Sequence, residues 1–76
     1  MDTEKTQKIH GIIAEVVGFD AKDIKDEDRF IMDYSIAYNE RKALLEKLNA
    51  EFGKTLDFGA FCQLETVGSV LHAYLD

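Results

Sequence analysis

Few side chains in this sequence are of the types that nucleophilic, metal or acid–base chemistry needs. Cys62 is the only cysteine and no catalytic base flanks it, so we expect a small buried hydrophobic residue. His10 and His72 have no cysteine or second histidine at ligand spacing, and we expect both at the surface or its boundary. No glycine-rich phosphate loop, nucleophile elbow or paired-carboxylate motif occurs. We therefore predict that the protein is not an enzyme.

An acidic stretch between Asp20 and Arg29 is the densest group of oxygen ligands in the chain. Its carboxylates lack the alternating spacing and the central glycine of an EF-hand calcium loop. We therefore expect a solvated acidic loop and no metal site. Ile24 within the loop and Phe30 after it are the large apolar residues that should hold it to a core.

Three stretches have apolar residues at the three- and four-residue spacing of an amphipathic helix. Thr3 is placed to cap the first helix, and Gly18 and Gly53 follow the first and second helices where a left-handed glycine ends a helix. The buried stripe of the second helix should be Leu44, Leu45, Leu48 and Phe52. The predicted helices are residues 3–17, residues 40–52 and the segment from Thr66 onward.

Leu56–Leu64 is a short apolar stretch in which a single turn and a short helix are equally compatible, because Gly59 weakens a helix. No segment alternates with the period of two that a strand shows. We therefore predict an all-α fold, a four-helix bundle with a long first loop and a short third helix.

Composition indicates one acidic domain over residues 1–76. The sequence has nine Lys and Arg and fifteen Asp and Glu, which gives a net charge of −6. This negative charge argues against nucleic acid as a partner. The apolar runs are far shorter than the roughly 20 residues that span a bilayer. The polar N-terminal segment has no signal-peptide core behind it, and the single cysteine cannot form an internal disulfide. We expect a cytoplasmic monomer with no membrane span.

Five landmarks hold their mutual spacing without gaps when the chain is laid on a typical acyl carrier protein. They are Val17-Gly18-Phe19 after the first helix, Phe30 at the end of the loop, Phe52 ending the second helix, Leu56 shortly after, and Thr66-Val67 opening the last helix. The chain thus resembles the acyl carrier protein family over almost its whole length. The resemblance implies an acidic four-helix bundle that carries acyl groups on a phosphopantetheine arm, attached to the serine of an Asp-Ser-Leu motif.

The sequence departs from the family at the attachment position, where the ungapped comparison places Ala37-Tyr38-Asn39. Tyr38 cannot take the arm by simple analogy, because the transferase is shaped around the hydroxyl of a short side chain. We expect its ring to pack toward the first or third helix with its hydroxyl in water. Ser35 is the alternative phosphopantetheine site, which requires a first loop three residues shorter and a second helix three residues longer. Otherwise Ser35 caps the second helix or faces solvent.

The resemblance implies docking to enzymes of fatty acid, polyketide or related thioester metabolism, or to a dedicated partner. The family presents an acidic second helix, whereas here Arg41, Lys42 and Lys47 offset the acidic residues, and charge governs the choice of partner. Two alternatives are a non-carrying interaction module with the same bundle and an unrelated helical bundle. The expected docking residues are Ile36, Tyr38, Arg41, Lys42 and Leu45, and Ile36, Tyr38, Leu44, Leu45 and Leu48 would border an acyl group.

Overall fold

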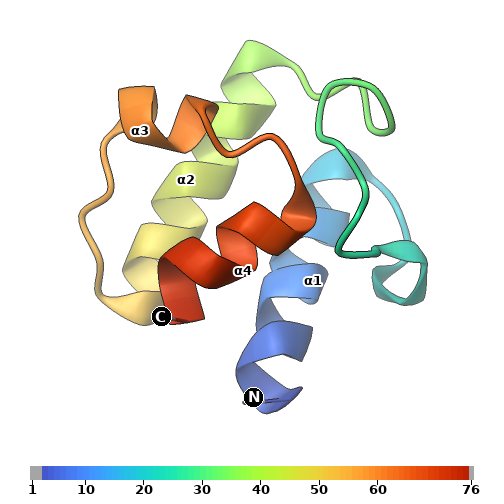
Figure 1. Ribbon diagram of the computed structural model, residues 1–76, viewed down its shortest axis with the longest axis horizontal. Helices are drawn as coiled ribbons and strands as arrows, with labels where there is room; N and C mark the ends of the chain where they lie inside the picture. The colour runs from blue at the N-terminus through green and yellow to red at the C-terminus, as the bar shows by residue number, and fades with distance from the viewer. Residues whose placement is uncertain (1–2, 76) are drawn as a thin grey trace.

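The computed structural model describes residues 3–75, and the regular elements in that part of the chain are all helices. Helices α2 and α4 both pack against α1 (Figure 1). Helix α3 lies beside the first turns of α2. The predicted all-α class is therefore confirmed for these residues. The elements are α1 (Thr3–Val17), the 3-10 helix η1 (Ala21–Asp23), α2 (Tyr38–Phe52), α3 (Phe58–Cys62) and α4 (Val67–Leu75).

Left-handed glycines end both long helices, as predicted. Gly18 has φ +78° and its N–H donates to the Ala14 carbonyl at 2.8 Å, while Gly53 has φ +64° and bonds to the Asn49 carbonyl. An L side chain is strained in this conformation, so glycine is the residue that lets the chain leave the helix there. Thr3 is the first residue of α1, so it does not precede the helix as the predicted cap would.

Helix α2 begins at Tyr38, two residues before the predicted start at residue 40, and of the two structural alternatives for Ser35 the solvent-facing one is found and the helix cap is not. The residue before the helix is Ala37, whose extended backbone (φ −84°, ψ 163°) is that of an N-cap but whose methyl group accepts no hydrogen bond. Glu40 provides the capping interaction instead, because its Oε1 accepts from the Ala37 N–H at 2.8 Å. The three-residue extension of the helix toward Ser35 is therefore not found.

The core takes side chains from all four α-helices and from the long first loop. Ile24 and Phe30, the two predicted loop anchors, are 4% and 2% exposed. In α2 the predicted stripe is confirmed for its three leucines, whereas Phe52 is only half-buried against Tyr74. The fully buried side chains are Ile9, Ile13, Phe30, Leu44, Leu48, Val67 and Val70.

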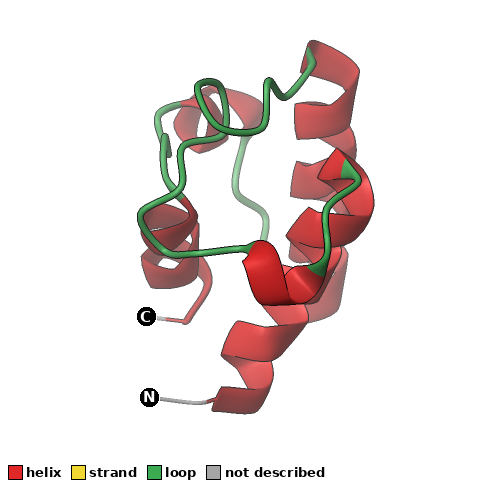
Figure 2. Cartoon of the chain, turned by 90° about the vertical axis from the view of Figure 1, so that its right-hand side faces the viewer, coloured by secondary structure: helices red, strands yellow, loops and turns green. Residues whose placement is uncertain are grey.

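The end of the first loop is hydrogen-bonded to the start of α4. The Phe30 N–H donates to the Glu65 carbonyl at 3.0 Å, and the Val67 N–H donates to the Asp28 carbonyl at 3.0 Å. Figure 2 shows the two loop segments side by side. These bonds fix the backbone on either side of Arg29 and so position the residues that follow it.

The short apolar piece is a five-residue helix, α3, which settles the choice between a helix and a single turn. Asp57 caps it, with Oδ1 accepting from the Ala60 N–H at 2.7 Å. Phe61 points into the core at 2% exposure, while Phe58 is half-buried and meets Tyr38 of α2. No helix within residues 3–75 is both long enough and apolar enough to cross a membrane.

Candidate functional site

Ser35 lies in the loop before α2, three residues before the first helical residue. It is exposed, and its side chain makes no hydrogen bond to any described residue. Its backbone is left-handed at φ +50°, and its N–H donates to the Ile31 carbonyl at 3.1 Å. A serine in this region is strained by about 1–2 kcal/mol relative to glycine. The hydroxyl is thus accessible, but it is not presented from a helix.

Tyr38 is the first residue of α2, the position at which the ungapped comparison places the family's serine. Its side chain is 68% exposed, and its ring meets the Phe58 ring of α3 edge-on with centroids 5.1 Å apart. The expectation that it packs toward the third helix is therefore confirmed. This aromatic contact joins the first turn of α2 to α3.

The expected docking residues divide into accessible and inaccessible ones. Lys42 is exposed, and Ile36 and Arg41 are half-buried, so each presents part of its side chain to a partner. Leu45 is only 7% exposed and belongs to the core, so its side chain is not available for docking. Leu44 and Leu48 are fully buried as well.

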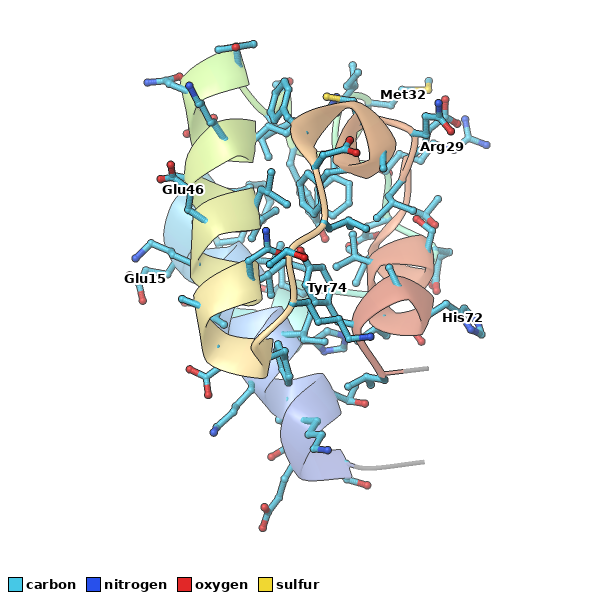
Figure 3. All side chains as sticks on the ribbon, turned by 90° about the vertical axis from the view of Figure 1, so that its left-hand side faces the viewer. Glu15, Arg29, Met32, Glu46, His72 and Tyr74 are labelled. Atoms are coloured by element: carbon cyan, nitrogen blue, oxygen red, sulfur yellow. The ribbon has the colours of Figure 1, made fainter. Side chains whose placement is uncertain are left out.

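A surface pocket of about 220 Å³ lies near the start of α2, and we call it the arginine pocket. Ile31 and Met32 on its rim are 63% and 72% exposed. Figure 3 shows Met32 and Arg29 together beside α3, with Arg29 Nη1 donating to the Met32 Sδ at 3.3 Å. The lining residues are Arg29, Ile31, Met32, Arg41, Cys62 and Glu65.

Sequence reasoning found only Arg41 among the residues of this pocket as a docking residue. Cys62 was expected to be buried, but it is half-buried and lines the pocket wall. The sequence does indicate that Ile31 and Met32 are unusual, since two large apolar residues directly follow the loop anchor Phe30. In the structure both of them face outward, while Phe30 is buried.

Tyr34, a buried residue of the first loop, holds the segment that carries the pocket rim. The Tyr34 hydroxyl donates to Asp28 Oδ2, which also accepts from the Lys25 N–H at 3.0 Å. The bond from Tyr34 and the Lys25 N–H lower the pKa of Asp28. Burial, with the bond to Asp28, raises the pKa of the Tyr34 phenol. While Tyr34 is protonated and Asp28 is ionised, this hydrogen bond holds residues 28 and 34 of the loop together.

Other contacts between titratable side chains in the described part of the chain are isolated pairs. His10 Nε2 lies 3.2 Å from Asp26 Oδ1, and the carboxylates of the acidic loop are mostly exposed. Lys47 pairs with Glu15 across α1 and α2 at 3.3 Å. No group of three or more metal-ligating side chains occurs within residues 3–75.

The chain matches no family model and no curated protein in comparisons with known proteins. Its function therefore has to be inferred from the surface around Tyr38 and from the order of the helices. That surface combines an exposed aromatic ring, an apolar rim and two arginines. Exposed aromatic, methionine and arginine side chains are the types enriched in protein–protein interfaces.

Proposed function

We propose that this protein is an acyl-carrier-like docking protein. It binds enzymes of fatty acid, polyketide or related thioester metabolism through the surface at the start of α2, and it carries no phosphopantetheine arm at Tyr38. The observation that carries this proposal is the start of α2 at Tyr38, the position that the resemblance assigns to the arm-bearing residue. A bundle that keeps this geometry without the serine supports recognition rather than acyl transport.

The five landmarks of the resemblance support the same proposal. Gly18 is left-handed after α1, Phe30 is buried, and Phe52 ends α2. Leu56 packs against the core, and Thr66 opens α4, with its Oγ1 accepting from the Ser69 N–H at 3.2 Å. These structural roles of the landmark residues support the proposal.

The docking role is tested by cross-linking inside the organism that encodes the protein. A photoreactive amino acid replaces Asn39, an exposed residue in the first turn of α2. The control places it at Glu4, in the first turn of α1 at the opposite end of the bundle (Figure 1). We expect enzymes that act on acyl thioesters to be captured through position 39 and not through position 4. Capture of the same proteins from both positions, or of no thioester enzyme, contradicts the proposal.

An arm on Ser35 is a second candidate, favoured by the exposure of its hydroxyl and the lack of a hydrogen bond to any described residue. The two candidates differ in what Ser35→Ala does to cross-linking through position 39. A docking protein captures the same enzymes with or without the hydroxyl. A carrier at Ser35 loses the partners that hold it through the arm.

A further inference from the structure

Both arginines of the chain line the arginine pocket. Arg29 comes from the long first loop and Arg41 from the first turn of α2, so only the folded chain brings them to one pocket. The other Lys and Arg residues are all lysines. Two of them form ion pairs between α1 and α2, Lys8 with Glu51 at 3.0 Å and Lys47 with Glu15 at 3.3 Å. In a chain of net charge −6, the two arginines concentrate positive charge at one place.

The two guanidinium groups lack carboxylate partners among residues 3–75. The Arg41 side chain makes no ion pair or hydrogen bond there, although it is half-buried. Arg29 donates only to the sulfur of Met32, which is a weak acceptor. A guanidinium binds a carboxylate through two parallel hydrogen bonds, so both arginines are available for that interaction. Glu65 adds one negative charge to the wall, which leaves the lining net positive.

The apolar rim indicates what accompanies the carboxylate. Ile31 and Met32 are among the most exposed large apolar side chains of the described chain. Covering such a side chain completely is worth about 1.5–3 kcal/mol. A partner that meets only the arginines would leave this area in water, so the ligand must be apolar as well as acidic.

The size of the pocket favours a side chain of a protein segment over a whole small molecule. Pockets that bury a small ligand measure roughly 300–1,000 Å³. The arginine pocket, at about 220 Å³, accommodates one large side chain of a partner. The residues next to that side chain in the partner then lie on the rim. This is the geometry of an interface anchor, in which one residue fills a pocket and the surrounding contacts exclude water.

We propose that the arginine pocket docks an acidic, apolar peptide segment of a partner protein. One aromatic or large aliphatic side chain of that segment enters the pocket, and neighbouring Asp or Glu side chains pair with Arg29 and Arg41. This assignment rests on the proposed docking function and adds to it the chemistry of the segment that the partner supplies.

The test is a selection of random 12-residue peptides displayed on phage against the purified protein. We expect enriched sequences to hold an aromatic or aliphatic residue flanked by Asp or Glu. The best peptide is then synthesised with a fluorophore, and its affinity is measured by anisotropy. Replacing either arginine by Glu should weaken it at least tenfold, because each change removes a charge pair and adds repulsion.

Lys22→Glu is the matched control, with the same change from a positive to a negative charge on an exposed side chain of η1 that does not line the pocket. It should weaken the peptide less than threefold. Should an arginine variant lose its helical circular dichroism, Met32→Asp tests the same pocket at a side chain 72% exposed. It should weaken binding by a similar factor.

Cys62 provides an independent readout in the unaltered protein, because this single thiol lines the pocket. A saturating peptide should slow its reaction with a thiol reagent at least fivefold. An unchanged rate, enriched peptides without Asp or Glu, a selection that enriches nothing, or binding indifferent to both arginines overturns the assignment. Cross-linking through position 39 would still report the proposed docking function, since it needs no peptide and no intact arginine pocket.

Discussion

Ser35 and Tyr38 are the two residues near the start of α2 that were considered as attachment positions, and the fold gives them different roles. Tyr38 begins the helix and packs on Phe58, so it forms part of a surface. Ser35 occupies a left-handed turn whose N–H returns to Ile31. Its position is thus explained by the turn that shapes the pocket rim, without any chemistry at its hydroxyl.

The first prediction concerns the backbone strain at Ser35. Ser35→Gly should raise the free energy of unfolding by about 1 kcal/mol, because glycine adopts φ +50° without the clash of a Cβ atom. Urea unfolding followed by circular dichroism measures the change. Ser35→Ala keeps the Cβ atom and should give no such gain. Equal stability of the glycine and alanine variants would show that the turn is not left-handed.

The second prediction concerns the Tyr34–Asp28 pair and its dependence on pH. The lowered pKa of Asp28 contributes stability that is present above its ordinary value of 3.8 and lost as the pH falls toward the folded value. The raised pKa of Tyr34 contributes stability that is full below pH 10.0 and lost as the pH rises toward the folded value. Removing the phenol therefore matters most between these limits.

Tyr34→Phe should lower the free energy of unfolding at pH 7 by about 1 kcal/mol, the typical net worth of a hydrogen bond. The difference from wild type should shrink both below pH 3.8 and above pH 10.0. Urea titrations at pH 3, 7 and 10.5 measure it. Tyr38→Phe, at an exposed phenol, is the control. A Tyr34→Phe difference that stays constant across this range would contradict the pairing.

At the start of α2 the Glu40 side chain accepts a hydrogen bond from the Ala37 N–H. The side chain of Ala37, the residue before the helix, makes no capping hydrogen bond. This explains why the start of α2 was the boundary that sequence reasoning placed least well. A serine is a better cap than an alanine, so Ser35 was the natural candidate. The strong stop signals, Gly18 and Gly53, were predictable because few other residues tolerate the left-handed conformation.

The third prediction completes that cap. Ala37→Ser should raise the free energy of unfolding by about 1 kcal/mol, because its hydroxyl can accept from the Glu40 N–H while the Glu40 carboxylate still accepts from residue 37. Thermal unfolding should show this as a melting temperature higher by roughly 4–8 °C. Ala50→Ser, at an exposed site inside α2, should instead cost a few tenths of a kcal/mol. A loss at position 37 would mean that α2 begins elsewhere.

The fourth prediction compares two helical glycines that differ in their surroundings. A Cβ atom at Gly11 of α1 meets nothing within 4 Å, so Gly11→Ala should stabilise the protein by about 0.8–1 kcal/mol. A Cβ atom at Gly68 of α4 lies 3.2 Å from the Asp26 carbonyl oxygen, which accepts from the Gly68 N–H at 2.8 Å. Gly68→Ala should therefore gain less or lose stability. Equal gains at both sites would show that the loop does not contact α4.

At the scale of the whole molecule, the sequence predicted the helices and most of the core but not the candidate site. Apolar spacing locates a helix and its buried face because both depend on neighbours within a few residues. Only tertiary packing brings together the residues that line the arginine pocket, which are Arg29, Ile31, Met32, Arg41, Cys62 and Glu65. Leu45 was assigned both to the buried stripe of the second helix and to the docking surface, and its 7% exposure agrees with the buried stripe.

The net charge of −6 is distributed unevenly over the folded chain. Most of the acidic residues of the first loop are exposed, whereas the two arginines share one pocket. In the proposed docking, a carboxylate-bearing segment meets two neighbouring positive charges at this pocket. The proposed docking function therefore depends on where charge lies on the fold, and net charge alone does not reveal it.

The proposed function requires that this bundle docks to its partners without carrying a phosphopantetheine arm. The most direct measurement is the intact mass of the purified protein after incubation with a promiscuous phosphopantetheinyl transferase and coenzyme A. Wild type and Ser35→Ala are compared, with a typical acyl carrier protein as the positive control. We predict no gain in mass for either form while the control is fully loaded. A gain in wild type that Ser35→Ala abolishes would contradict the claim and make the protein a carrier with a displaced attachment site.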